Sequence, residues 1–147
     1  MRRRLWLLLL AVIVIIGLLL YPSTQCRVTA TDLTISPAKT FVIPVLEGYA
    51  VGFSFNVTNR SSCEVHAQKI SVLLRSATYA DGRQVAQNSE EVEAVAGTLT
   101  PGQFGIFSHT FDSYFTYRPM KLQLRIEITF EQTGPIVVFD GELPVSA

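Results

Sequence analysis

The chain has little of what catalytic and metal sites are made from. Its 147 residues include only two histidines, His66 and His109, and two cysteines. There is no Gly-x-Ser-x-Gly nucleophile motif, and Gly102-x-x-Gly105 lacks the third glycine of a nucleotide-binding loop. Cys63 and His66 are three residues apart, which places them on opposite faces of a strand, and zinc needs three or four ligands. We therefore expect a non-enzymatic protein without a metal or cofactor.

Charged residues are also scarce, at 16% of the chain, and the formal net charge is zero. Three of the twelve basic residues are Arg2–Arg4, which leaves nine basic against twelve acidic residues, a net charge of −3, in the rest of the chain. A domain of this charge does not attract nucleic acid. We interpret the neighbouring carboxylates Glu90 and Glu91 as a solvated turn.

One long apolar run is present, the 17 residues Leu5–Tyr21 directly behind Arg2–Arg4. As a helix it would be about 25 Å long, slightly less than the roughly 30 Å hydrocarbon core of a bilayer. Basic flanks stay on the cytoplasmic side, and Trp6 and Tyr21 suit the two interfaces. We predict a cytoplasmic tip and transmembrane signal anchor over residues 1–25, and an extracytoplasmic domain over residues 26–147 of a single-pass cell-membrane protein.

Two other fates of this segment are open. A cleaved signal peptide usually has an apolar core of about 7–15 residues and a small-x-small cleavage site, which the stretch Tyr21–Gln25 does not offer. Lipid modification of Cys26 would require a lipobox, and Ser23-Thr24-Gln25 has neither its leucine nor its small residue before the cysteine. The uncleaved anchor is the interpretation that we favour.

Cys26 and Cys63 allow a single disulfide. An oxidising exterior favours their pairing, and closing a loop of about 38 residues would contribute about 4 kcal/mol in the chain-entropy model. Two unpaired thiols are the alternative.

The chain after Tyr21 shows alternation typical of strands and no long helical periodicity. Tyr49–Thr58 and Met120–Phe130 are the clearest cases, each with one apolar and one polar face. Further strands are expected at Val28–Thr31, Leu33–Ile35, Phe41–Ile43, Cys63–Tyr79, Arg83–Gln87, 92–96, Phe104–Thr110 and Ile136–Leu143. We expect Asn88–Glu93 to be an exposed polar segment.

Turn and bulge signals complete this pattern. A change of phase near Gln68-Lys69 predicts a β-bulge, Asp81-Gly82 predicts a hairpin, and Thr100-Pro101-Gly102-Gln103 fits a type II turn. The sequence therefore predicts an all-β fold, an antiparallel β-sandwich of the immunoglobulin or fibronectin III type behind one N-terminal transmembrane helix.

Aromatic residues cluster between Phe104 and Tyr117, where six of the chain's fifteen lie within fourteen residues. We favour a strand over Phe104–Thr110 followed by a loop, although the spacing also fits a helical face. The rings either fill the core or form a partly exposed patch. For the second case we expect Tyr114, Phe115 and Tyr117 to form an interface with a partner.

Two triplets match the N-glycosylation pattern, Asn56-Val57-Thr58 and Asn59-Arg60-Ser61. In a host that glycosylates, we expect Asn59 to be the better acceptor because it lies in a predicted turn, and Asn56 to be the second candidate; otherwise these are turn residues.

Four features resemble the type 2 late-embryogenesis-abundant domain, also called the water-stress-hypersensitivity domain. They are the strand ending in Val57-Thr58-Asn59, the hairpin at residues 81–86, the turn at residues 99–102 and the closing segment Phe139-Asp140-Gly141-Glu142-Leu143. The resemblance implies a fibronectin III-like, non-catalytic and often membrane-anchored domain that protects or binds other molecules.

We expect a non-enzymatic, membrane-anchored interaction or accessory module, such as a small subunit of a membrane or cell-envelope complex. Its partners would be membrane lipid, through the N-terminal helix, and another membrane or envelope protein. The alternative is a stress-protective domain of the late-embryogenesis-abundant kind that contacts lipids or client proteins.

Overall fold

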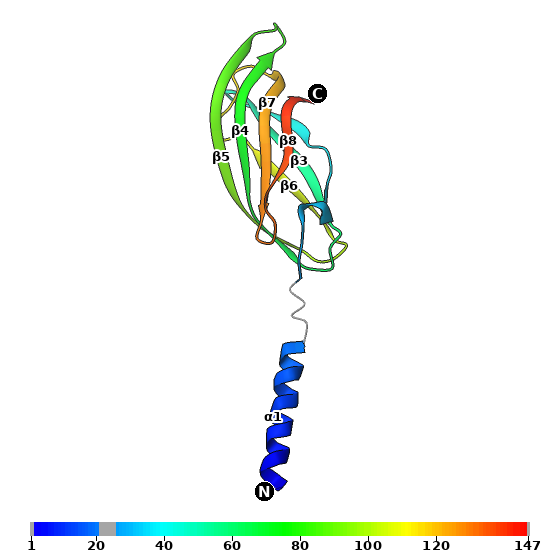
Figure 1. Cartoon of the computed structure of the whole chain (residues 1–147). Coiled ribbons are helices and arrows are strands. Elements are labelled where there is room, and N and C mark those ends of the chain that lie inside the picture. The colour runs from blue at the N-terminus through cyan, green and yellow to red at the C-terminus, as the bar shows by residue number, and fades with distance from the viewer. Residues whose placement is uncertain (1, 21–25, 147) are drawn as a thin grey trace.

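The computed structural model of the chain describes residues 2–20 and 26–146 (Figure 1). It begins with helix α1, Arg2–Leu20. In these two ranges, no helix has the length and apolar character needed to cross a membrane. Tyr21, the last residue of the apolar run, and Pro22–Gln25 lie outside the described residues.

Eight strands form two antiparallel sheets. The first sheet contains β1 (Leu33–Ile35), β2 (Lys39–Val45), β3 (Gly48–Asn59) and β6 (Phe104–Thr110). In this sheet β3 is central, with β6 on one side and β1 and β2 on the other. The second sheet has the order β5–β4–β7–β8, with bounds β4 Val65–Tyr79, β5 Gln84–Leu99, β7 Pro119–Phe130 and β8 Gly134–Pro144.

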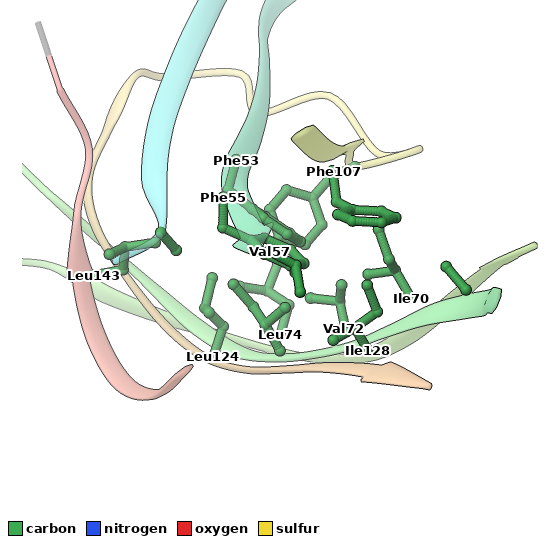
Figure 2. Close-up of a cluster of buried hydrophobic side chains, with 14 of the residues drawn as sticks. Phe53, Phe55, Val57, Ile70, Val72, Leu74, Phe107, Leu124, Ile128 and Leu143 are labelled. Carbon is green, nitrogen blue, oxygen red and sulfur yellow. The ribbon is translucent and has the colours of Figure 1, made fainter. Parts of the chain in front are cut away.

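The buried core lies between the two sheets, as the alternation predicts. Phe53, Phe55 and Val57 point inward from β3 and meet side chains from the second sheet such as Val72 and Leu124, all of them almost fully buried (Figure 2). Burying one such side chain contributes about 1.5–3 kcal/mol. The all-β sandwich predicted from the sequence is confirmed at this level.

The predicted turns and the predicted bulge are also present. The register of β4 shifts between Ala67 and Lys69 against both neighbouring strands. Gly82 and Gly102 both have φ of +80°, and the Gln103 N–H donates to the Thr100 carbonyl at 3.0 Å. These positive φ angles are the ones that favour glycine in tight turns.

Two sequence-based expectations are wrong. Val28–Thr31 is not a strand, because the Asp32 carboxylate accepts the Thr29 N–H at 2.8 Å and caps a short 3₁₀ helix, Ala30–Asp32. The strands expected at Arg83–Gln87 and 92–96 are not separate, because the polar stretch Asn88–Glu93 between them, largely exposed as expected, pairs with β4 within one continuous strand, β5. Only Asn88, at φ +47°, departs locally from extended backbone.

Candidate functional site

The first described residues of the domain are fastened to it by a disulfide. Cys26 and Cys63 are bonded, with their Cα atoms 5.8 Å apart, which confirms the predicted pairing. Cys63 is buried and lies between the end of β3 and the start of β4. The chain therefore enters the sandwich at this end.

Asn59, next to the disulfide, has a structural role that excludes glycosylation in the folded domain. Its side chain is 0% exposed, and Nδ2 donates to the Cys63 carbonyl at 2.6 Å and to the Leu99 carbonyl at 2.9 Å. Its Oδ1 accepts the Ser61 N–H at 3.0 Å. A glycan on Nδ2 would break these bonds, so the expectation for Asn59 is wrong. Asn56 is exposed on β3 and stays a candidate.

A tyrosine–arginine cluster, made of Tyr79, Arg83, Tyr114 and Tyr117, lies around the β4–β5 hairpin and the β6–β7 loop. The guanidinium carbon of Arg83 is 5.4 Å from the ring centre of Tyr79 and 5.7 Å from that of Tyr117. The two rings meet edge to face at 6.5 Å. Tyr114 and Tyr117 are each 62% exposed, and all four residues line one surface groove.

Phe115, the third residue predicted at this interface, is an anchor in the core. It is 4% exposed and packs edge to face on Phe111 at 6.4 Å. Its N–H and carbonyl pair with the carbonyl and N–H of Tyr49 at 2.9 and 2.8 Å. A side chain on Gly48 would collide with the Phe115 carbonyl, so this approach requires glycine. Phe115 thereby holds Tyr114 and Tyr117 in place.

The disulfide and the tyrosine–arginine cluster lie at opposite ends of the sandwich. β4 starts two residues after Cys63 and ends at Tyr79, in the cluster. Its 15 residues span roughly 45–50 Å at the rise of an extended strand. In Figure 1 the β4–β5 hairpin is the end of the sandwich farthest from α1.

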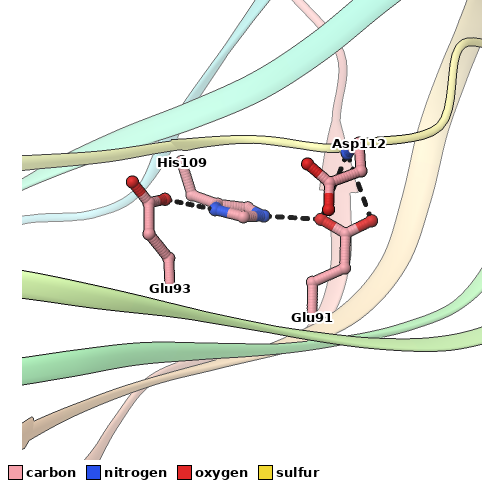
Figure 3. A network of polar contacts seen from close by, with 4 residues as sticks. All are labelled: Glu91, Glu93, His109 and Asp112. Atoms are coloured by element: carbon pink, nitrogen blue, oxygen red, sulfur yellow. Dashed lines mark hydrogen bonds and ion pairs between the residues drawn. The ribbon is translucent and has the colours of Figure 1, made fainter.

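A second polar site, the His109 clamp, joins the edges of the two sheets and consists of His109 on β6 with Glu91 and Glu93 on β5 (Figure 3). Nε2 lies 2.7 Å from Glu91 Oε2, and Nδ1 lies 2.6 Å from Glu93 Oε2. His109 is 6% exposed, and its ring packs against Phe53 and Phe111. Each ring nitrogen of His109 therefore has a carboxylate partner on β5.

Sequence reasoning missed this clamp and assigned Glu91 to a solvated turn. The partners are 16 and 18 residues apart, and no local motif connects them. The signal that could have found them is strand phase. His109 shares the inward phase of Phe107 on β6, and the two glutamates share the inward phase of Leu99 on β5. Charged residues at inward positions of two edge strands are expected to pair with each other, because an unpaired buried charge is costly.

The outer face of the second sheet has balanced charges. Arg75 contacts Asp140 at 2.6 Å, and Arg125 contacts Glu127 at 2.6 Å and Asp140 at 3.6 Å. The hydrogen bond from Arg75 lowers the pKa of Asp140 and raises the pKa of Arg75 itself. Within residues 2–20 and 26–146, no group of three or more His, Cys, Asp or Glu residues is arranged to hold a metal ion.

Comparison with known proteins yields only distant structural likenesses. No protein-family model matches the sequence, and no curated protein matches it significantly. The putative ApaA protein of Bordetella pertussis aligns at 16% identity and TM-score 0.46, over 78% of this chain and 93% of that one. The structural-genomics target SoR45 aligns at 12% identity and TM-score 0.49, over 80% of this chain and 88% of that one.

The sporulation control protein Spo0M of Bacillus subtilis aligns at 16% identity and TM-score 0.42, over 76% of this chain and 50% of that one. Because all three scores are below 0.5, these likenesses support no inference about activity or partners.

Proposed function

We propose that the protein is a non-enzymatic interaction module, tethered to the cell membrane at one end and binding a partner protein at the other. The observation that carries this proposal is the placement of the exposed tyrosine–arginine cluster at the end of the sandwich opposite Cys26. A domain fastened at one end can offer its far end to a neighbour with the least hindrance from the membrane.

The tether would be α1 together with the rest of the apolar run Leu5–Tyr21. All side chains described on this helix, from Trp6 to Leu19, are exposed. Exposing a helix that is apolar on every side to water costs free energy, whereas the hydrocarbon of a lipid bilayer solvates such a helix. The flanking Arg2–Arg4 support a topology with the N-terminus in the cytoplasm and the sandwich outside. The strand order of the two sheets supports an assignment to the fibronectin III-like or immunoglobulin-like sandwiches.

The composition of the cluster supports protein binding. Tyrosine and arginine are enriched among the residues whose truncation weakens interfaces most. Tyr114 and Tyr117 are presented by a loop that Phe115 anchors to β3, so little conformational entropy is lost when a partner binds.

The environment of the histidine in the clamp supports a non-enzymatic role. Both ring nitrogens of His109 already face carboxylates at hydrogen-bond distance, so neither is free to accept a proton from a substrate. The clamp contributes to structure by joining β5 and β6 at the His109 end of β6.

Co-purification from native membranes tests the proposed function. The full chain would be compared with the double variant Tyr114→Ala/Tyr117→Ala and with Val92→Ala/Val137→Ala, which removes exposed apolar side chains elsewhere. A partner protein should co-purify with the wild type and the control and fall at least tenfold with the tyrosine variant. Equal recovery with all three would contradict the proposal. Recovery of lipid without a protein would favour the stress-protective alternative.

A further inference from the structure

Edge strands expose backbone N–H and C=O groups that can pair with another chain. Proteins protect such edges with prolines, charged residues, bulges or very short strands. In the part of the chain that the structure describes, the edges are β5 and β8 in one sheet, and β6 and the β1–β2 side in the other.

Three of these four edges carry protective features. β1 has three residues and β2 contains Pro44. β8 contains Pro135 and Asp140, and its register with β7 is interrupted. β5 contains the exposed Glu90, a residue with positive φ at Asn88, and two shifts of register against β4.

β6 lacks these features. Its seven residues, Phe104–Thr110, contain no proline, lysine, arginine, aspartate or glutamate. Its register with β3 runs without interruption from Phe104 opposite Thr58 to Thr110 opposite Gly52. Two large apolar side chains on its outer face are exposed, Phe104 at 61% and Ile106 at 69%. Such an edge is a template for strand pairing.

The space beside β6 has room for another backbone. A groove runs between β6 and β5, and its β5 wall includes three small residues, Ala94, Ala96 and Gly97. The floor of the groove is part of the buried core. A Cβ atom added at Gly105 would come within 2.8 Å of Cδ2 of the buried Leu99, so the two strands are closely packed there. Glycine and alanine are the residues that permit close approach of a second chain.

One end of this groove is acidic. Past Glu93 it continues into a region lined by Glu91, His109 and Asp112. Glu91 and Glu93 both contact the single imidazole of His109, and Asp112 adds a third carboxylate to the lining, so this end of the groove carries excess negative charge. Glu93 keeps 49% of its side chain exposed, and Asp112 is exposed. A cationic side chain on an added strand would complement this end.

We propose that the free edge of β6 binds an extended segment of another protein, added to the sheet as a strand. The segment carries apolar side chains two residues apart, which pack beside Phe104 and Ile106, and a lysine or arginine at the end that lies near Glu93 and Asp112. Backbone hydrogen bonds supply the affinity, and the alternating side chains supply the specificity. This surface is distinct from the tyrosine–arginine cluster and extends the proposed function.

A random library of ten-residue peptides, displayed on phage and selected on the full-length chain in detergent, tests this proposal. Selected peptides should alternate apolar residues and carry lysine or arginine at one end. On saturation, hydrogen exchange of the Ile106 and Ser108 amides, which point away from β3, should slow. N-methylation of alternate peptide bonds should weaken binding at least tenfold, because it removes the backbone donors.

Two variants locate the binding edge. Ile106→Lys adds a charge at an exposed position of β6 and should weaken binding at least tenfold, whereas Val137→Lys, at an exposed position of the β8 edge, should leave it unchanged. Failure to select any peptide, or equal binding to Ile106→Lys, would overturn the proposal. A dimer of the chain that dissociates in Ile106→Lys would also overturn it, because the occupant would then be a second copy.

Discussion

Asn59 Nδ2 lies 2.9 Å from the carbonyl oxygen of Leu99, and this bond joins the end of β3 in one sheet to the end of β5 in the other. The same amide donates to the Cys63 carbonyl at 2.6 Å. One buried side chain thus connects both sheets and the disulfide at the end where the chain enters the sandwich.

Replacing Asn59 with alanine should therefore destabilise the domain. Two buried carbonyls would lose their donor, at a cost of about 2–4 kcal/mol in the free energy of unfolding. Asn56→Ala, at an exposed position three residues earlier, should change it by less than about 0.5 kcal/mol. Urea unfolding of the two variants measures the difference. Equal effects, or a glycan on Asn59 in the folded protein, would contradict the assigned role.

The His109 clamp should behave as a coupled unit. His109→Ala leaves the carboxylate of Glu91, 12% exposed, without its hydrogen-bond partner and should lower the free energy of unfolding by about 2–4 kcal/mol. The triple variant Glu91→Ala/Glu93→Ala/His109→Ala should lose clearly less than the sum of the single variants, because no uncompensated charge remains. Additive losses in denaturant unfolding would show that the three side chains do not interact.

Loss of the Cys26–Cys63 bond should destabilise the sandwich by about 4 kcal/mol if constraint of the unfolded chain dominates, given the 37-residue separation. The measurement is urea unfolding of the full chain with and without reductant, with the variant Cys26→Ser/Cys63→Ala as the control. Reductant should shift the wild type to the midpoint of the variant and leave the variant unchanged. A wild type unaffected by complete reduction would refute the prediction.

The cap at Thr29 should make stability depend on acid pH. The hydrogen bond from the Thr29 N–H, followed by that from its hydroxyl, lowers the pKa of Asp32. A carboxyl group whose pKa is lower when folded stabilises the fold above its unfolded pKa, near 4, and loses this effect as pH falls through its folded pKa. The stability difference between wild type and Asp32→Asn should be constant above about pH 5 and shrink below it. A difference independent of pH would contradict this.

Much of the sandwich could be predicted because strict alternation fixes both the strands and their buried faces. Tyr49–Thr58 and Met120–Phe130 show this, and glycine at positive φ fixed the turns at Gly82 and Gly102. Polar inward positions could not be predicted in the same way. From local sequence alone, Glu91 resembles a solvated residue and Asn59 resembles a turn residue. In the fold, β6 brings His109 against Glu91, and Asn59 donates to the carbonyl of Leu99. Both assignments depend on contacts between residues distant in sequence.

The same reason explains the mixed result for the aromatic stretch. Local spacing did not distinguish Phe115, which pairs with Tyr49, from its exposed neighbours Tyr114 and Tyr117. An interface at this stretch remains a proposal, limited to Tyr114 and Tyr117, and Phe115 anchors the loop that carries them.

A photo-crosslinking amino acid at position 117 tests most directly whether the end remote from Cys26 binds a partner protein. It would be introduced into the full chain in native membranes, with position 69 as the control. Lys69 is exposed on the same strand, β4, near its Cys63 end. We predict a discrete protein adduct from position 117 that is at least tenfold weaker from position 69. No protein adduct from position 117, or equal adducts from both positions, would contradict the proposed binding end.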